Sequence, residues 1–472
     1  MSMILRDLSD DPADLACLGR FYEQLYIEGF PDADERESLA NMENYLRLRR
    51  QGWYGDNNYH IQVALEDGRV VAACVSDYLA RPNCGVIEFV LVEEARRGRG
   101  VGKTIHDATL GLLQNDARRV GRPDLDAVAI ELNDPFRVAP AEDNHDPFER
   151  AMVWDGWGYG RLCFPYVQPA LSESQQAVNC LLFAVKPIAP ALRETLPGAL
   201  VLDILEAYLR WAMRIERPEA NADFAAMKRF LQKQTGVQLE PLAAYIGRDP
   251  AKPLLVVPVS DRNSAQYLEV IEVYRRAFPP GPTAIDDGLF AQALAWPGKQ
   301  PGLHYHLWGL AEGPGQPIRG MASFFVMPRC GFAGYLALEP PLKGTGRAYV
   351  AVKRMEEQMI RDESGARDWY AECETGSAAE AIARRAGFAP VPVRYHQPAL
   401  DPSRFEGAGA GPQLTLLRKR LGSADAAPPL APEEFLDHLR MLLAEVYRMD
   451  DPKASETYRI ARASLLAPDG AA

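Results

Sequence analysis

The sequence predicts an α/β (α+β) chain with two similar domains in tandem, each a mixed, mostly antiparallel sheet with helices on both faces. Three observations support this prediction: the length, an internal repeat, and an order of strand and helix patterns common to both halves. At 472 residues the chain is too long for one hydrophobic core, because cores stop growing at roughly 250–300 residues. We expect domains at 1–187 and 253–421, a helical segment at 188–252, and a linker with a C-terminal helix at 422–472.

The repeat is visible in three short motifs. Tyr59-His60 recurs as Tyr305-His306, and RGRG at 97–100 recurs as KGTG at 343–346, both 246 positions later. YVQPAL at 166–171 recurs as YHQPAL at 395–400, only 229 positions later. The first copy therefore holds 17 more residues between its second and third motifs. We place them in the polar stretch Asn133–Asp146, as a long loop that is either a substrate lid or a tolerated surface insertion.

Strand and helix patterns follow the same order in both copies. Alternating or continuous apolar runs bounded by turn residues predict the strands, and longer amphipathic runs predict the helices. In the first copy we expect strands at 3–8, 60–65, 70–77, 86–92, 127–132 and 180–185, and helices at 14–28, 100–118 and 148–157. The second copy is expected to repeat this order between about 253 and 420.

Two segments outside the copies have helical patterns. Residues 200–215 carry charged side chains at spacings of three and four, which gives one polar stripe on an otherwise apolar helix. We expect this helix to pack between the two domains. Residues 432–448 have one apolar face, so we expect them to dock on the body of the protein or on a partner chain, the latter giving an oligomer.

Composition and charge argue against several classes of protein. A net charge of −12 is unfavourable for a nucleic-acid partner, which needs basic surface. Seven scattered cysteines without a C-x-x-C pair predict neither a disulfide framework nor a zinc site. The N-terminus becomes charged at once, and no apolar stretch reaches the 18 or so residues of a membrane span. We therefore expect a cytoplasmic protein without a membrane partner.

A Gly-rich turn follows the strand expected at 86–92 and precedes a helix. Its glycines let the backbone approach an anion closely, while the unpaired N–H groups and the dipole of the helix favour negative charge. Two nucleotide motifs fail here. A P-loop would need a glycine at position 97, which is Arg97, and the dinucleotide pattern lacks its third glycine. The turn therefore supports neither ATP nor NAD.

The turn resembles the coenzyme A pyrophosphate turn of the GNAT (GCN5-related N-acetyltransferase) superfamily, [QR]-x-x-G-x-[GA]. Arg97, Gly100 and Gly102 match this pattern, and the second copy has KxxGxA at 343–348, with Lys where the family has Gln or Arg. Gly158-Tyr159 and Gly387-Phe388 match the Gly-aromatic pair at the end of the family's last helix. The resemblance covers about residues 1–187 and 253–420, most of the chain.

This resemblance implies acetyl-CoA or another acyl-CoA as co-substrate. Backbone groups of Leu91 and Val92 would pair with the pantetheine arm, and the two turns would hold pyrophosphate. The turn residues implied in the two copies are Arg97, Gly98, Arg99, Gly100, Val101, Gly102 and Lys103, and Lys343, Gly344, Thr345 and Gly346.

Glu88 is the candidate general base, because a carboxylate that interrupts an apolar strand is costly unless it is solvated, paired or employed. Related enzymes often carry a Glu at this point. The alternative is an ordinary Glu that points to water. The second copy has Gly334 at the equivalent position, so we expect the chemistry in the first copy, although Glu372 or Glu374 could substitute in the second.

The general acid is harder to assign. The family's usual Tyr, four or five residues before the Gly-aromatic pair, is replaced by Trp154 in the first copy and by Ala383 in the second. Tyr166 is the remaining candidate, and its alternative is a core aromatic of the repeated motif.

His304 and His306 share one strand face, but no third ligand is evident, so we expect no metal site. We interpret the repeated Tyr-His pair as part of a pocket or a core.

The leading hypothesis is therefore an acyl-CoA-dependent N-acyltransferase, of the N-acetyltransferase type, that acts on the amine of a small metabolite, with protein N-termini or lysines as a second acceptor class. One alternative is a non-catalytic acyl-CoA-binding regulatory or scaffold module. Another is different acyl-CoA chemistry, such as decarboxylation, on the same fold, since fold resemblance cannot choose among reactions.

Overall fold

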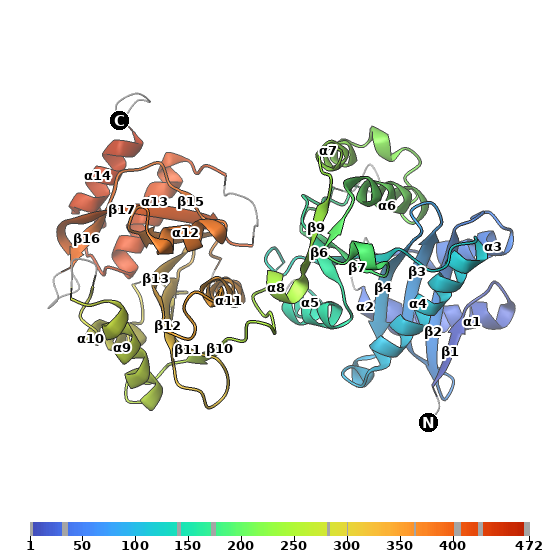
Figure 1. Cartoon of the computed structure of the whole chain (residues 1–472), viewed down its shortest axis with the longest axis horizontal. Coiled ribbons are helices and arrows are strands. Elements are labelled where there is room, and N and C mark those ends of the chain that lie inside the picture. The colour runs from blue at the N-terminus through green and yellow to red at the C-terminus, as the bar shows by residue number, and fades with distance from the viewer. Residues whose placement is uncertain are drawn as a thin grey trace. The chain divides into compact units, whose positions relative to one another are not determined.

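The computed structural model describes residues 3–30, 36–138, 143–170, 176–280, 284–299, 301–362, 365–400, 407–422 and 428–466 (Figure 1). The chain divides into unit 1, Met1–Asp134 with Asn144–Leu242, and unit 2, Pro135–Asp143 with Ala243–Ala472. Part of the predicted loop (139–142), Leu171 of the third motif and part of the expected linker (423–427) lie outside the described residues.

Unit 1 is built on a nine-stranded sheet. Its strands are β1 (Ile4–Asp7), β2 (Asn58–Glu66), β3 (Arg69–Leu79), β4 (Cys84–Val92), β5 (Ala127–Asn133), β6 (Gly160–Leu162), β7 (Leu181–Pro187), β8 (Thr195–Leu196) and β9 (Val237–Pro241). Its helices are α1 (Pro12–Phe21), α2 (Ile27–Gly29), α3 (Leu39–Arg50), α4 (Val101–Arg119), α5 (Pro147–Gly156), α6 (Gly198–Trp211) and α7 (Ala222–Leu231). The strand order is β1-β2-β3-β4-β5-β7-β6-β9-β8, and the pair β4–β5 is parallel within an otherwise antiparallel sheet.

Unit 2 repeats this plan on an eight-stranded sheet. Its strands are β10 (Leu255–Pro258), β11 (His304–Ala311), β12 (Gly320–Val326), β13 (Cys330–Leu338), β14 (Asp368–Cys373), β15 (Ala389–Pro390), β16 (Tyr395–Leu400) and β17 (Gly407–Arg420). Its helices are α9 (Ala265–Ala277), α10 (Gly288–Leu294), α11 (Arg347–Arg361), α12 (Ala378–Arg385), α13 (Pro432–Glu445) and α14 (Glu456–Leu465), and α8 (Leu242–Tyr245) begins at the boundary with unit 1. Here β13–β14 is the parallel pair.

Helices cover both faces of each sheet, because successive side chains of a strand point to opposite sides. In β2, Tyr59 and Ile61 join a core that also contains residues of α1 and α3, whereas His60 and Gln62 bond to side chains of α4. In β12, Phe325 packs with α13 and Phe324 with α11. The structure thereby confirms the predicted fold class, a mixed sheet between two layers of helices in each unit.

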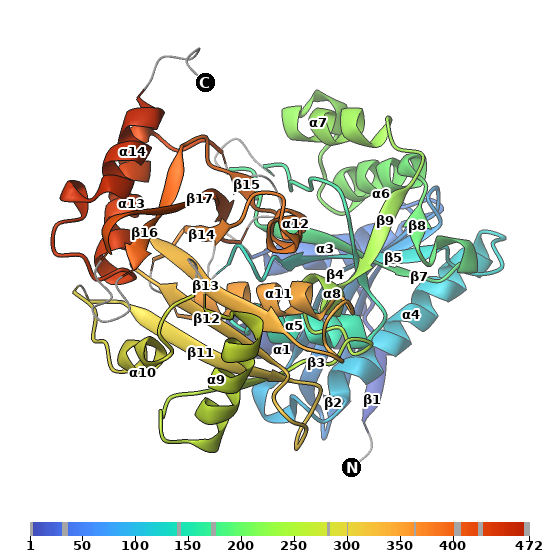
Figure 2. The same ribbon diagram turned by 60° about the vertical axis from the view of Figure 1, so that its left-hand side comes forward.

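A helix of 14 residues follows the last antiparallel strand of each copy, α6 in unit 1 and α13 in unit 2. We expected the first of these between the two domains, but its apolar face lies in the core of unit 1, together with Phe183 and Val185 of β7. The apolar face of α13 lies in the core of unit 2, and α14 packs on β16 and β17 (Figure 2). Each copy is therefore completed by the helical segment that follows it.

The strand registers locate the extra residues of the first copy. Cys84 pairs with Ala127 and Cys330 pairs with Asp368, so the offset between the copies falls from 246 in β4 to 241 in β5. Five of the 17 extra residues therefore precede β5, and the prediction that placed them all in the loop at 133–146 is wrong in this part. Within unit 2, Phe136 of this loop packs its ring 5.2 Å from that of Tyr245.

A buried histidine ties β2 to the last turn of α4. Its Nε2 lies 2.7 Å from Oδ2 of Asp116, and its Nδ1 lies 3.0 Å from Oδ2 of Asp7. Burial would lower the pKa of His60, but the hydrogen bonds to Asp116 and Asp7 outweigh it and raise that pKa to about 9. In unit 2, His306 Nε2 likewise lies 2.7 Å from Asp362 Oδ2. The histidine of the repeated motif thus bonds to a carboxylate at the end of the helix in both units, and the contact of His60 is an ion pair.

The ion pair makes the stability of unit 1 depend on pH. A group whose pKa is higher in the folded state stabilises the fold fully below its unfolded pKa, here 6.5, and this contribution is lost as the pH rises through about 9. We expect a loss of up to about 3 kcal/mol across this interval in the wild type, and little of it in His60→Gln. Pulse proteolysis in urea at about pH 6 and pH 10, with unit 1 peptides identified by mass, measures it.

His304→Gln is the matched control, because His304 is exposed at the start of β11, in unit 2. It should leave the pH dependence of unit 1 unchanged. An equal pH dependence in His60→Gln and in the wild type would contradict the role given to His60.

Candidate functional site

The parallel strands of both units part after four paired residues. Residues 84–87 of β4 pair with 127–130 of β5, and residues 330–333 of β13 pair with 368–371 of β14. Beyond these pairs the strands run on to Val92 and Asn133 in unit 1, and to Leu338 and Cys373 in unit 2, with no further pairing between the described residues of the two strands. The facing edges are therefore open to a ligand that can pair with backbone groups.

A β-bulge lies where the strands part. In unit 1, Val75 pairs with Phe89 and Ser76 pairs with Ile87, which leaves Glu88 as the bulged residue of β4. In unit 2, the same irregularity on β12 and β13 leaves Gly334 as the bulged residue. A bulge re-aims the side chain that it carries, and such irregularities are common next to active sites. The equivalence of Glu88 and Gly334 inferred from the repeat offset is consistent with this register.

Both Gly-rich turns have the same backbone conformation. Gly98 and Gly100 have φ of 72° and 81°, and Gly344 and Gly346 have φ of 77° and 83°. Gly100 and Gly346 cap the N-termini of α4 and α11, in the left-handed region that side chains with a Cβ rarely adopt. Nothing lies within 4 Å of a Cβ built on Gly98 or Gly100, so the space over the first turn is open.

The residues that the family resemblance implies for coenzyme A binding lie on and beside the first turn. Arg97 and Arg99 are exposed, and Arg97 Nε donates to the carbonyl of Val92 at 3.2 Å. Lys103 is exposed and pairs with Asp107 one turn along α4. The remaining residues of this set differ in exposure. Leu91 and Val92 are half-buried on the unpaired end of β4, Val101 is buried, and Gly102 is partly exposed.

The second turn has a different cation beside it. The position of a Cβ on Gly346 would lie 3.3 Å from Nζ of Lys252, a residue that sequence reasoning did not single out. Lys343, Gly344 and Thr345 are exposed, and the hydroxyl of Thr345 donates to the carbonyl of Leu342 at 2.5 Å. The second turn, which has Lys343 where the family has Gln or Arg, thus keeps the same backbone geometry as the first.

Glu88 lies beside a second carboxyl group. Glu88 is exposed on the surface of the strand, while desolvation of its carboxyl group raises its pKa well above the ordinary value. Asp77, 1% exposed, raises the pKa of Glu88 further through its charge and a hydrogen bond. Two carboxyl groups can share a hydrogen bond only when one holds a proton. The pKa of Glu88 therefore depends on the neighbouring carboxyl group of Asp77 as well as on burial.

Arg214, in the segment after α6, brings positive charge to this pair. Its guanidinium carbon lies 4.6 Å from the ring centre of Tyr45, and its Nη2 donates to the hydroxyl of Tyr54 at 2.6 Å. Its charge lowers the pKa values of Asp77 and Glu88 against the effect of burial. Nε and Nη1 of Arg214 and Oδ2 of Asp77 are buried without a hydrogen-bond partner among the described residues. Such buried groups mark a place where water or a ligand binds.

A third carboxyl group, which sequence reasoning missed, faces the strand of Glu88 from β5. Glu131 is the first residue of β5 beyond the paired segment. Tyr166 donates to its Oε1, and Tyr208 of α6 and Gln168 donate to its Oε2 at 2.8 and 3.0 Å. Burial and Glu131 together raise the pKa of Tyr166 well above its ordinary value. The hydroxyl group of Tyr166, the candidate acid, is thus engaged in a hydrogen bond to Glu131.

Unit 2 repeats this arrangement. Glu372 is the first residue of β14 beyond the paired segment, and it accepts hydrogen bonds from Tyr395 and, at 2.8 and 2.9 Å, from Tyr447 just after α13. Burial raises the pKa of Glu372 to about 7, although the two hydroxyl groups lower it. The sequence contained a usable signal: Tyr166 and Tyr395 begin the third repeated motif, and each has a Glu in a preceding apolar strand.

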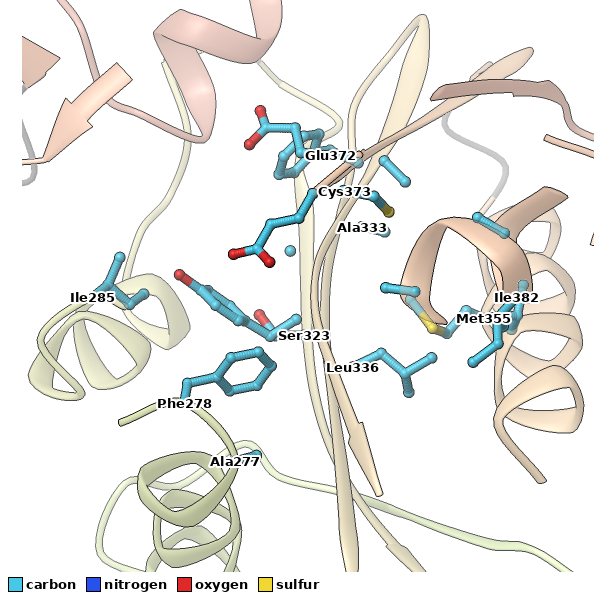
Figure 3. Close-up of a pocket in the computed structure, with 18 of the residues that line it drawn as sticks. Ala277, Phe278, Ile285, Ser323, Ala333, Leu336, Met355, Glu372, Cys373 and Ile382 are labelled. Atoms are coloured by element: carbon cyan, nitrogen blue, oxygen red, sulfur yellow. The ribbon is translucent and has the colours of Figure 1, made fainter. Parts of the chain in front are cut away.

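A cavity of about 750 Å³ crosses the sheet of unit 2 at this point (Figure 3). Figure 3 shows Phe278 and Ile285 on one side of the strands, and Leu336, Met355 and Ile382 on the other. Glu372 lines the cavity where β13 and β14 part, and Lys343 and Gly344 of the second turn line it as well. The cavity therefore connects the second Gly-rich turn with the opposite face of the sheet.

One group of side chains in unit 2 has the composition of a metal site. Ligand atoms of Asp368, Glu434 and His438 lie within 4.8 Å of one another. Asp368 already pairs with Arg418 Nε at 2.7 Å, and His438 Nδ1 lies 3.0 Å from the Tyr370 hydroxyl. The neighbouring guanidinium is unfavourable for a bound cation. Of the two histidines that the sequence suggested as ligands, His306 bonds to Asp362 and His304 is exposed at the start of β11.

The family comparison concerns unit 1. The model of the acetyltransferase (GNAT) family matches residues 20–127, the span that includes β2–β4, the first Gly-rich turn and α4. A sequence comparison with curated proteins finds no significant match. Among the described residues, no helix has both the length and the apolar character needed to cross a bilayer.

Several solved structures are similar to parts of the chain. A tandem GNAT protein from the clavulanic acid biosynthesis pathway is 14% identical over 90% of this chain and 100% of that one, with a TM-score of 0.28. The ribosomal-protein-S18-alanine N-acetyltransferase from Escherichia coli is 9% identical over 40% and 95% of the two chains, with a TM-score of 0.26. The PaiA N-acetyltransferase from Thermoplasma acidophilum, in complex with coenzyme A, is 11% identical over 40% and 99%, also with 0.26. At these scores no conclusion on function follows.

The hydrogen bond between Tyr166 and Glu131 should stabilise unit 1. Tyr166→Phe leaves a buried carboxylate without one of its donors, so we expect a loss of about 1–3 kcal/mol. Pulse proteolysis in urea measures it. Tyr22→Phe is the control, because the Tyr22 hydroxyl donates only a long bond, 3.2 Å, to the carbonyl of Glu37. Equal stability of Tyr166→Phe and the wild type would show that this bond does not support the fold.

Proposed function

We propose, on the premise that this chain is a tandem GNAT protein, that it transfers an acyl group from coenzyme A to the amine of a small metabolite, with this chemistry in unit 1. One observation carries the proposal: Glu88 occupies the bulge where β4 and β5 part, on the strand that leads into the open Gly-rich turn. A carboxylate, an open strand edge and an anion cradle therefore lie in succession along one strand.

The fit of acyl-CoA to unit 1 is supported by the open groups along this path. The first-turn N–H groups of α4 are available to a pyrophosphate, and the exposed Arg97, Arg99 and Lys103 supply positive charge around it. The unpaired edge of β4 at Leu91 and Val92 suits an extended pantetheine arm with its amide groups. A thioester at the end of that arm would reach the point where Glu88 lies.

The proposed reaction needs a base, because an aliphatic amine is mostly protonated near neutral pH. Glu88 accepts this proton, and the raised pKa of its carboxyl group brings it closer to the working pH, which makes it a stronger base than an ordinary Glu. Attack of the amine forms the C–N bond and breaks the C–S bond. The thiolate takes a second proton from the nitrogen, and one N–H stays in the amide product. Tyr166 is a positioning residue in this scheme, because its hydroxyl group holds the carboxylate of Glu131 in place.

The acceptor proposed for unit 1 is a polar amine. Asp77 has an unpaired buried carboxylate oxygen, and Arg214 has two unpaired buried N–H groups. A small molecule with hydrogen-bonding groups next to its amine would satisfy them, whereas a purely apolar amine would leave them unpaired at a cost of about 1–3 kcal/mol each. The net charge of −12 also favours the approach of a cationic amine.

Release of free thiol from acetyl-CoA, measured with a panel of polar amines, tests this function. We expect at least one amine whose kcat falls about 10²–10⁴-fold in Glu88→Gln, because a positioned base contributes a factor of this size. Gly100→Glu should raise KM for acetyl-CoA, because a carboxylate would repel the pyrophosphate from the cradle. Gly346→Glu, the matched change in unit 2, should leave this reaction intact.

Two outcomes would contradict the proposal. Binding of acetyl-CoA without turnover of any amine would favour a binding or regulatory module, and release of CO₂ from a malonyl-type acyl-CoA would favour decarboxylation. Unchanged kcat in Glu88→Gln would remove Glu88 from the mechanism.

The pH profile of the same reaction gives a further prediction. Since Glu88 must be ionised to accept a proton and its pKa is raised well above 4.5, kcat should rise with pH through that higher pKa. Asp77→Asn removes the neighbouring charge, so we expect the rise to shift to lower pH. A profile that does not move in Asp77→Asn would contradict the coupling of these two carboxyl groups.

A further inference from the structure

We infer that unit 2 is a second acyltransfer site, whose acceptor is a primary amine on an apolar body and whose proton acceptor is Glu372. This inference rests on the acyl-CoA chemistry proposed above, but it assigns a separate site and a different acceptor class. It is carried by the cavity of unit 2 and by the position of Glu372 within it.

The cavity reaches solvent-exposed residues on both faces of the sheet. On the side of α11 its lining includes the exposed Lys343 and Gly344 of the second turn. On the side of α9 it includes the exposed Pro279 and Pro280. A passage that is lined at one end by an anion turn and at the other by an apolar mouth suits two different substrates, which meet inside the sheet.

Glu372 lies where those two substrates would meet. It is the first residue of β14 beyond the segment paired with β13, and Gly334 of the bulge faces it without a side chain. Both residues line the cavity. The bulge of unit 2 thus lacks the carboxylate that unit 1 has at Glu88, and Glu372 on the opposite strand, the counterpart of Glu131, lines the cavity.

The lining on the acceptor side selects an apolar body. It includes Leu289 and Phe290 of α10, and Phe278 and Ile285 of the segment between α9 and α10. The charged residues of the whole lining are Lys343, Glu372 and Glu374. Since Lys343 belongs to the turn, the described lining of the acceptor side carries negative charge and no cation of its own, although Arg448, outside the lining, interacts with Tyr305. This lining suits an ammonium group on an alkyl or aromatic body, and its carboxylates are unfavourable for an acceptor that carries a carboxylate.

The protonation state of Glu372 fits this role. With a pKa of about 7, the carboxyl group is substantially ionised near neutral pH and can accept a proton from an ammonium group. Tyr395 and Tyr447 hold the carboxylate in place. The ammonium group loses one proton to Glu372, which returns it to solvent. The amine nitrogen then forms a C–N bond to the thioester carbon, the C–S bond breaks, and the thiolate takes the second amine proton.

The two units thus differ in what their acceptor sides can bind. Unit 1 places Asp77, Glu88 and Arg214 around the point where its strands part, with unpaired polar atoms among them. Unit 2 places aromatic and aliphatic side chains around the equivalent point. A polar amine and an apolar amine are therefore expected to use different units of the same chain.

The test uses the full chain, acetyl-CoA and two pairs of amines, with 2-phenylethylamine and octylamine as apolar acceptors and ethanolamine and putrescine as polar ones. Glu372→Gln should lower kcat for the apolar pair at least about 100-fold. Gly346→Glu should raise KM for acetyl-CoA in the same reaction. Glu88→Gln, a change in unit 1, should leave kcat and KM of this apolar-amine reaction in unit 2 unchanged. Glu433→Gln, which removes the same charge from an exposed position in the first turn of α13, is the control and should have no effect.

A second variant keeps the test valid if Glu372→Gln does not fold. Ile285→Trp fills the acceptor side from a half-buried position, and it should raise KM for the apolar amines about tenfold with kcat retained. Apolar-amine turnover that is lost in Glu88→Gln, or that survives both Glu372→Gln and Ile285→Trp, would overturn the inference, as would polar amines alone being accepted. If no amine of either class is acylated, the proposed function itself fails.

Discussion

The parting of two parallel strands is the constraint on which the rest of each unit depends. Four residue pairs hold β4 to β5 and β13 to β14, and the strands then diverge. Divergence exposes backbone edges inside a sheet, which is costly unless a ligand or water pairs with them. The bulge residue, the first unpaired Glu and the Gly-rich turn all lie at or beyond this point, so the same backbone feature organises the whole site in both copies.

Each copy is completed by a helix whose segment supplies a tyrosine to the first unpaired Glu of the diverging strands. Tyr208 of α6 bonds to Glu131, and Tyr447 just after α13 bonds to Glu372. A buried carboxylate requires such donors, because its desolvation would otherwise force it to take up a proton. Duplication thus preserved a carboxylate with two tyrosines in each copy, while the bulge residue diverged between Glu88 and Gly334. We attribute the proposed difference in acceptors to this divergence and to the cavity lining.

Sequence reasoning predicted the fold class and located some of the residues that the structure brings together in the candidate site. The repeat, the Gly-rich turns and the equivalence of Glu88 with Gly334 could be found because each has a short local pattern. Glu131 and Glu372 were missed or left as substitutes because their partners come from a later motif and from a following helix, and only the fold brings these together. The cavity of unit 2 was also beyond reach, since its walls come from helices far apart in the sequence. The loop prediction failed in part because the registers place five extra residues before β5.

The central claim is that one chain holds two separate acyl-CoA sites of unequal acceptor class. Isothermal titration calorimetry of the full chain with acetyl-CoA directly tests the number of acyl-CoA sites. We predict two molecules bound per chain in the wild type, one in either Gly100→Glu or Gly346→Glu, and none in the double variant, because each substitution blocks one helix N-terminus. A single molecule bound per chain, unaffected by one of the two substitutions, would contradict the account.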